Sequence, residues 1–243
     1  MIRQAVIMAG GLGSRLKGRT DAMPKGFIEL GGEAIVRASI RKLISAGIEE
    51  IIIGTGHCSE WYDKLADELH IITCVRNNEY ADTGSMGTLL RCAENVTGDF
   101  LLLESDLIYD SLGLFALINE QRSNVILASG ATASGDEVYL EADSGANLVR
   151  HSKNRNDLSG IYGELVGISK LTKKTLDAMV VHCNAHLGDE PRMEYETAMS
   201  AVSAAAEPGD KIGILKLDDY AWREIDDETH LAMAAEKVFP EIV

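Results

Sequence analysis

The sequence Ala9-Gly10-Gly11-Leu12-Gly13-Ser14-Arg15-Leu16 is a glycine-rich turn that follows directly on an apolar run at residues 5–9. A short apolar run that ends in glycines is typical of a buried β-strand. Glycines at such a point let backbone N–H groups approach phosphate oxygens, because no Cβ stands in the way. The stretch therefore predicts a strand that leads into a phosphate-binding turn.

Outward from this turn, short apolar runs alternate with helical patterns over the first half of the chain. The predicted strands are residues 51–53, 71–75, 100–103 and 125–128, and the predicted helices are residues 34–46, 61–69, 86–93 and 112–118. This alternation predicts a three-layer α/β fold, in which a mostly parallel sheet carries helices on both faces. Ligands of such sheets bind beyond the carboxyl ends of the strands, which is where the glycine turn falls.

The alternation breaks after Gly130, and the pattern there indicates a smaller second lobe. The expected elements are a hairpin at residues 138–141 and 148–151, strands at 164–168, 212–217 and 222–225, and helices at 172–181, 193–205 and from about 228. We therefore expect one domain over residues 1–243. Its parts would be a nucleotide-binding core (1–130), an acceptor lobe and lid (about 131–220), and a C-terminal metal-ligand strand and helix (221–243).

The composition limits the classes of function. The chain has 243 residues, of which 46% are hydrophobic, and a net charge of −15. This negative charge disfavours nucleic acid and anionic membranes, so we expect neither as a partner. The four cysteines form no CxxC pair, and the N-terminal apolar run is too short for a signal peptide. We therefore expect free thiols and a cytoplasmic location.

Basic residues gather around the glycine turn in spite of this acidity. Arg15, Lys17, Arg19 and Lys25 lie within eleven residues, with Asp21 as the only acid among them. The turn lacks the third glycine of a dinucleotide-binding fingerprint and the Gly-Lys-Ser/Thr of a Walker A loop. The clustering favours a triphosphate ligand. A plain strand-to-helix turn with an incidental basic segment remains the alternative for the turn taken alone.

Together with Thr20 and Pro24-Lys25, the glycine turn resembles the signature of nucleoside-triphosphate transferases that act on sugar phosphates and small phospho-alcohols. Gly10 stands where many members of that family carry alanine, a change that we expect only to loosen the turn. Glu104-Ser105-Asp106 looks like the family's acidic turn after a central strand, and residues 222–226 look like its C-terminal metal-binding segment. The short length and the tail are most similar to cytidylyltransferases for phosphocholine, 2-aminoethylphosphonate or inositol phosphate.

Displacement at the α-phosphorus requires that developing charge be neutralised and that pyrophosphate be held as it leaves. We predict that Arg15 holds the β- and γ-phosphates and that Lys25 holds the transferring α-phosphate, as catalytic residues. Asp106 and Asp226 are the predicted Mg²⁺ ligands, because Mg²⁺ favours one or two carboxylates together with phosphate oxygens. For each aspartate a helix cap is the alternative, with a neighbouring aspartate as competitor.

Other segments supply candidate ligands for the nucleotide and the acceptor. The nucleotide candidates are Ala9, Gly10, Gly11, Leu12, Gly13, Ser14, Ser85, Met86, Thr88 and Ser105. The resemblance implies that the segment with Ser85 and Thr88 faces the base and ribose, although a plain N-cap is an equal alternative for Ser85. The acceptor candidates are Lys153, Glu164, Glu194, Tyr195 and Glu196. The resemblance implies that Lys153 reaches the acceptor phosphate. A carboxylate beside an aromatic ring suits an ammonium group, with a solvated helix face as the alternative.

The sequence therefore predicts a Mg²⁺-dependent cytidylyltransferase that moves CMP from CTP to a small phosphonate or phosphate, with 2-aminoethylphosphonate before phosphocholine. A catalytic base is not required, because such an acceptor is already an anion near neutral pH. A sugar-1-phosphate nucleotidyltransferase that uses UTP, dTTP or GTP is one alternative. A non-catalytic nucleotide-binding regulatory module is another. The resemblance also implies a homodimer.

Overall fold

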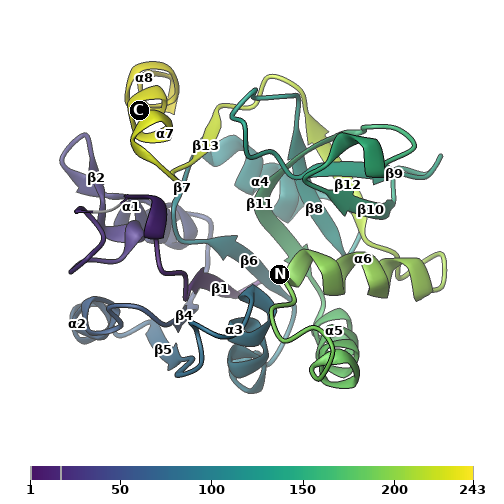
Figure 1. Ribbon diagram of the computed structural model, residues 1–243, viewed down its shortest axis with the longest axis horizontal. Helices are drawn as coiled ribbons and strands as arrows, with labels where there is room; N and C mark the ends of the chain where they lie inside the picture. The colour runs from purple at the N-terminus through teal and green to yellow at the C-terminus, as the bar shows by residue number, and fades with distance from the viewer. Residues whose placement is uncertain (1, 17, 243) are drawn as a thin grey trace.

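The computed structural model describes residues 2–16 and 18–242 of the chain. Within these residues the main structural feature is a nine-stranded mixed sheet (Figure 1). Its centre is a parallel group of strands in the order β6-β1-β4-β5. These strands are β1 (Gln4–Ala9), β4 (Glu50–Thr55), β5 (Ile72–Arg76) and β6 (Phe100–Glu104).

Antiparallel pairing extends the sheet on the other side of β6. The strand beside β6 is β11 (Gly163–Leu171), which pairs antiparallel with β6, with β8 (Val125–Ser129) and with β9 (Tyr139–Ala142). On the far side of β8 lies β12 (Gly213–Leu217). β9 forms an antiparallel hairpin with β10 (Leu148–Ser152).

Helices cover both faces of this sheet, because alternate side chains of each strand point to opposite faces. Ile7 and Leu103 belong to an apolar cluster with α1, α2 and α4, whereas Val6 and Leu102 belong to a second cluster with α3, α5 and α6. The helices are α1 (Ile35–Ser45), α2 (Glu60–Glu68), α3 (Ser85–Cys92), α4 (Ser111–Asn119), α5 (Lys173–His186), α6 (Tyr195–Ala205), α7 (Glu228–Met233) and α8 (Phe239–Ile242).

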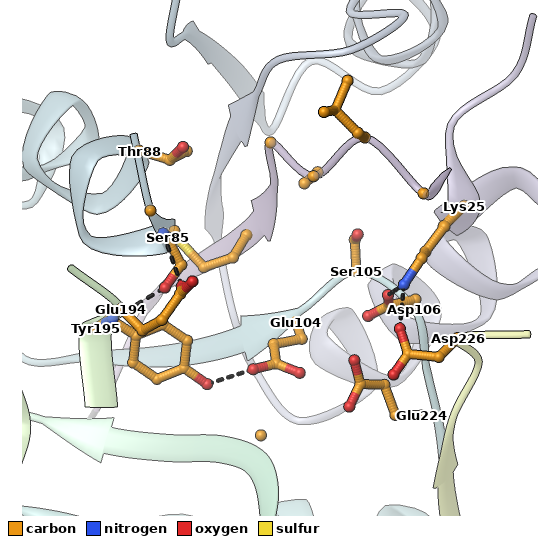
Figure 2. Close-up of a pocket in the computed structure, with 18 of the residues that line it drawn as sticks. Lys25, Ser85, Thr88, Glu104, Ser105, Asp106, Glu194, Tyr195, Glu224 and Asp226 are labelled. Carbon is orange, nitrogen blue, oxygen red and sulfur yellow. Dashed lines mark hydrogen bonds and ion pairs between the residues drawn. The ribbon is translucent and has the colours of Figure 1, made fainter. Parts of the chain in front are cut away.

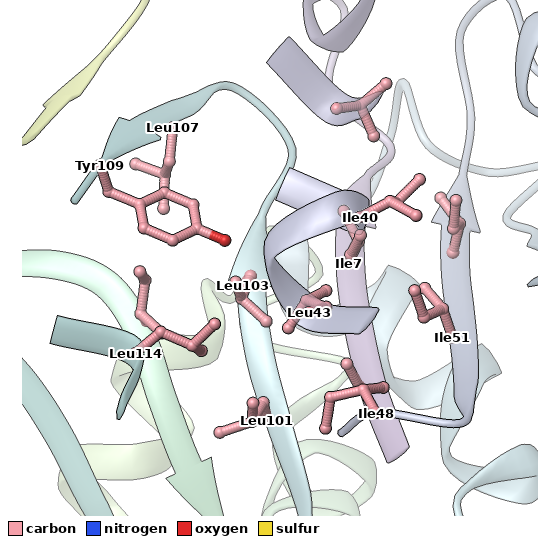
Figure 3. Packing of buried hydrophobic residues seen from close by; sticks show 14 of the residues in the cluster. Ile7, Ile40, Leu43, Ile48, Ile51, Leu101, Leu103, Leu107, Tyr109 and Leu114 are labelled. Atoms are coloured by element: carbon pink, nitrogen blue, oxygen red, sulfur yellow. The ribbon is translucent and has the colours of Figure 1, made fainter. Parts of the chain in front are cut away.

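Helix α1 shows how the sequence pattern produces this packing. Val36, Ile40 and Leu43 recur at helical spacing, and all three are almost completely buried. Figure 3 shows Ile40 and Leu43 among the apolar side chains that pack on the sheet. Gly47 follows the helix with a φ of +90°, a conformation that glycine adopts without a steric penalty. The helix therefore begins and ends close to the predicted limits.

A small two-stranded ribbon brings the C-terminal segment back to the centre of the sheet. It consists of β7 (Leu107–Tyr109), just after β6, and β13 (Trp222–Glu224), which pairs antiparallel with it. A third apolar cluster, which includes Ile108, Ile225 and Val238, packs α7 and the segment after it against this ribbon. This packing fixes where the residues after β13 lie.

The predicted three-layer α/β architecture is confirmed. Each predicted strand and helix has a counterpart within a few residues of its expected limits. The sequence did not predict β7, because this strand has only three residues and its partner β13 lies near the other end of the chain. Among the described residues, none of the helices combines the length and apolar character needed to cross a lipid bilayer.

Ser203 on α6 offers a test of how this helix is attached to the sheet. Its fully buried hydroxyl donates to Leu148 O at 2.8 Å and accepts from Ile212 N at 3.2 Å. We expect Ser203→Ala to lower the free energy of unfolding by about 1–3 kcal/mol, because it leaves buried polar groups without this partner. Chemical denaturation measures this loss. Ser45→Ala, at an exposed position, is the control. An equal loss of unfolding free energy in both variants would show that the buried Ser203 hydroxyl does not attach α6 to the sheet.

Candidate active site

A cavity of about 450 Å³ opens beyond the carboxyl ends of β1 and β6, above the glycine turn. Most of the residues predicted from the sequence to be functional line it. They are residues 9–13 of the turn with Ser85, Thr88 and Ser105, the charged residues Arg15, Lys25, Asp106 and Asp226, and the acceptor candidates Lys153, Glu194, Tyr195 and Glu196. The tertiary structure thus gathers candidates from the whole length of the chain at one place.

Two predicted residues are not brought into this cavity, Met86 and Glu164. Met86 is fully buried in the apolar cluster beneath α3, because it lies on the sheet-facing side of the helix. The Glu164 carboxylate accepts hydrogen bonds from Thr132 N and Oγ1, both at 2.7 Å, and anchors the loop after β8. The side chain of Ser14 lies outside the described part of the chain. The geometry therefore supports structural positions for Met86 and Glu164.

The glycine turn is held by contacts that explain its sequence. Thr20 Oγ1 donates to Gly13 O at 2.9 Å, and Gly13 has a φ of +63°. A Cβ at Gly10 would lie 2.7 Å from Thr88 Oγ1 on α3. The glycine at this position therefore does not merely loosen the turn, as expected, because it makes room for Thr88.

Lys25 lies between the two aspartates that the sequence singles out (Figure 2). Its Nζ is 3.0 Å from Asp106 Oδ2 and 2.5 Å from Asp226 Oδ1, and Arg15 Nη2 is 3.2 Å from the same Asp226 oxygen. Burial opposes the charge of Lys25, but the carboxylates of Asp106 and Asp226 outweigh this effect and raise its pKa. Lys25 therefore remains a cation at the floor of the cavity.

The ribbon of β7 and β13 causes this convergence. Asp106 directly precedes β7, Asp226 lies two residues after β13, and Ile225 N donates to Asp106 O at 3.0 Å. The Asp226 side chain is only 2% exposed, and its Oδ2 has no hydrogen-bond partner among the described residues. A buried carboxylate oxygen with a free lone pair is suited to a cation.

Two glutamates that were not predicted as ligands from the sequence lie beside these aspartates. Oxygens of Glu104, Asp106 and Glu224 are within 4.8 Å of one another. Burial, together with the neighbouring carboxylates, raises the pKa of both Glu104 and Glu224 well above the usual range. A signal was present, because Glu-x-Asp occurs at both 104–106 and 224–226. In an extended segment, residues two apart point to the same side. This oxygen-rich set fits a divalent cation such as Mg²⁺.

The N-termini of α3 and α6 meet at the opposite wall of the cavity. Ser85 N donates to Glu194 Oε2 at 2.9 Å, and Tyr195 N donates to Ser85 Oγ at 2.9 Å. Each helix is thus capped by a side chain from the other. Ser85 and Glu194 line the cavity but already have structural partners.

Tyr195 and Glu196 connect this wall to the carboxylate group. The Tyr195 hydroxyl donates to Glu104 Oε1 at 2.6 Å (Figure 2). Glu196 Oε2 is buried and has no hydrogen-bond partner among the described residues. Burial, with the negative charge of Glu194 nearby, raises the pKa of Glu196 to about 7. The wall opposite the glycine turn is therefore acidic and partly apolar.

The fold and this cavity define an α/β protein with a glycine turn, a lysine and a carboxylate group at the carboxyl ends of its central strands. The chain belongs to the MobA-like NTP transferase domain family, whose model matches residues 5–133. The resemblance found in the sequence is thereby confirmed.

Named relatives support this placement. The chain is 28% identical to 2-aminoethylphosphonate cytidylyltransferase of Lancefieldella rimae over 160 residues, which are 65% of this chain and 64% of that relative. It is 27% identical to choline-phosphate cytidylyltransferase of Streptococcus pneumoniae over 109 residues, 45% of this chain and 47% of the relative. The chain spans about half the length of the curated relatives it matches.

A solved structure shows the same fold. The inositol-1-phosphate CTP transferase from T. maritima matches with a TM-score of 0.83 at 16% identity, and the match covers 99% of this chain and 96% of that one. The predicted nucleotide-transferase fold is therefore confirmed over nearly the whole chain.

The contact between Gly10 and Thr88 can be tested by stability measurements. We expect Gly10→Ala to lower the free energy of unfolding by about 1–3 kcal/mol, because the added methyl group overpacks the space beside Thr88. The same change in a Thr88→Ala background should cost clearly less. Gly11→Ala is the matched control, since a Cβ there meets nothing within 4 Å. Equal losses from Gly10→Ala in both backgrounds would contradict the steric explanation.

Glu196 should make stability depend on pH. Its ordinary pKa is 4.5 and its pKa in the fold is about 7, so the folded state holds an extra proton between these values. Its contribution to stability is therefore present at low pH and is lost as the pH rises from about 4.5 to 7. We expect Glu196→Gln to raise Tm at pH 8 by roughly 2–6 °C, and to change Tm little near pH 5.

Thermal scans of the ligand-free protein across this pH range measure the effect of Glu196. Glu190→Gln, at an exposed position nearby, is the control for the loss of one negative charge. A Tm difference for Glu196→Gln that is the same at pH 5 and pH 8 would show that the carboxyl group does not titrate in this range.

Proposed function

We propose that the chain is a Mg²⁺-dependent cytidylyltransferase that transfers CMP from CTP to a small phosphonate or phosphate and releases pyrophosphate. We propose 2-aminoethylphosphonate as the first acceptor and phosphocholine as the second. The observation that carries this proposal is the meeting of Lys25, Asp106 and Asp226 beside the glycine turn. The named cytidylyltransferases among the relatives support the choice of nucleotide and acceptor.

The nucleotide side of the cavity has the parts that a triphosphate needs. Backbone N–H groups of the glycine turn offer donors to phosphate oxygens. Arg15 lines the cavity and would hold the β- and γ-phosphates, while Lys25 would meet the α-phosphate, where charge develops. Ser85 and Thr88 lie on the wall where the base and ribose would be placed.

The acceptor would enter from the side of Lys153 and the acidic wall. An anionic oxygen of the acceptor forms a bond to the α-phosphorus, the bond from that phosphorus to the bridging oxygen breaks, and pyrophosphate leaves with its charge. Lys153 would hold the acceptor's phosphonate or phosphate group. Tyr195 and Glu196 are suited to an ammonium group, because one offers an aromatic ring and the other a carboxylate.

The residues present fit the proposed Mg²⁺ ion. Asp106 and Asp226 would hold it, with Glu104 and Glu224 as further oxygen donors close by. The unpartnered Oδ2 of Asp226 supports this assignment. When bound, the ion would neutralise negative charge on the triphosphate.

Release of pyrophosphate tests the proposed function. We expect release only when CTP, Mg²⁺ and a phosphonate or phosphate acceptor are combined, and not when UTP, dTTP or GTP replaces CTP. Lys25→Ala and Asp106→Ala should each lower kcat/KM by about 100-fold or more, because each removes a charge at the centre of the site. Lys174→Ala, which breaks an exposed ion pair with Asp210, is the control.

Near-normal turnover in Lys25→Ala or Asp106→Ala would contradict the assigned roles, provided that thermal scans show both variants folded. Release of pyrophosphate with another nucleotide and a sugar 1-phosphate would replace the proposed substrates. Binding of CTP without turnover across the acceptor panel would contradict the catalytic proposal altogether.

A further inference from the structure

A carboxylate from the loop after β8 lies between two of the cations that face the cavity. Asp136 Oδ2 is 2.6 Å from Arg15 Nη1, and Asp136 Oδ1 is 2.9 Å from Lys153 Nζ. Arg15 follows the glycine turn, whereas Lys153 follows β10, so Asp136 joins the two sides of the cavity. Asp136 was not among the residues predicted from the sequence.

The loop that carries Asp136 is fixed on both sides of it. Before Asp136, the Glu164 carboxylate accepts from Thr132 N at 2.7 Å, and His230 Nε2 donates to Ser134 O at 3.1 Å. After it, Leu165 N donates to Val138 O at 2.9 Å. The scaffold therefore holds the backbone in place, and a rotation of the Asp136 side chain is enough to break both ion pairs.

The two cations are open to other anions. The side chains of Arg15 and Lys153 are 54% and 63% exposed, and both line the cavity. The Asp136 side chain is only 23% exposed. A carboxylate and a phosphate group accept the same charge-assisted hydrogen bonds from arginine and lysine. Asp136 and a substrate phosphate therefore compete for the same donors.

We propose that Asp136 is a positioning residue that takes the place of the substrate anion in the ligand-free protein. It holds Arg15 and Lys153 at the cavity, gives them up when the nucleotide and the acceptor bind, and takes Arg15 back as pyrophosphate leaves. The proposal rests on the proposed function, because that function assigns Arg15 to the β- and γ-phosphates and Lys153 to the acceptor.

This competition has a direct consequence for affinity. An anion that takes the Arg15 Nη1 donor must first displace Asp136, so Asp136 weakens the binding of nucleotide and of pyrophosphate alike. Partly exposed ion pairs have modest strength, so removal of the competitor should tighten binding about three- to fivefold. The difference should shrink at high salt, since salt screens exposed charges. A residue with only a structural role would not improve binding when it is removed.

Equilibrium binding tests the proposal without reliance on turnover. Calorimetric titrations with inorganic pyrophosphate, and separately with CTP, in the presence of Mg²⁺ would compare the wild type with Asp136→Asn and Asp136→Ala. We expect both variants to bind pyrophosphate and CTP about three- to fivefold more tightly at low salt. Asp210→Asn removes one negative charge from an exposed ion pair elsewhere and should leave both dissociation constants unchanged.

Each outcome decides the question. Equal or weaker binding in folded Asp136→Asn and Asp136→Ala would overturn the proposal, because it would make Asp136 either irrelevant or a supporting group. Equal tightening in Asp210→Asn would also overturn it, since overall charge would then explain the gain. A wild type that binds neither CTP nor pyrophosphate would instead contradict the proposed function, and the role of Asp136 with it.

Discussion

The candidate site depends on one buried ammonium group shared by two aspartates. Lys25 Nζ contacts Asp106 and Asp226, which come from the middle and the far end of the chain. Removal of one partner from a buried ion group leaves an uncompensated charge and is strongly unfavourable. The same three side chains are the ones that face the glycine turn. The stability of the fold at this point and the proposed chemistry therefore depend on the same three charged side chains.

The apolar structure around the site holds these charges together. The ribbon of β7 and β13 aligns the two aspartates, and the third apolar cluster presses the C-terminal helices against it. Glu104 and Glu224 lie beside the two aspartates, and carboxylates so close together repel one another when they are ionised. The packing of Ile108 and Ile225 offsets this repulsion, because burial of apolar surface favours the folded chain. The site is thus acidic, and apolar packing holds its carboxylates in place.

Several side chains whose type indicates ligand binding also have structural roles around the cavity. Ser85 and Glu194 cap the ends of two helices, and Glu164 anchors the loop that carries Asp136. Backbone N–H groups at helix and loop ends need acceptors as much as a substrate does. Serine and glutamate side chains therefore serve both as structural caps and as ligand-binding groups, and the local sequence does not show which role a given residue has.

The sequence by itself determined the layered fold and the glycine turn, and its resemblance to a known family singled out Lys25, Asp106 and Asp226. Apolar periodicity and turn residues are local properties, and they specify strands, helices and a tight glycine turn directly. Only the tertiary structure decided that Met86 faces the core, that Glu104 and Glu224 join the aspartates, and that Asp136 reaches Arg15. These facts depend on contacts between segments far apart in the chain, and no local pattern encodes the distance between them.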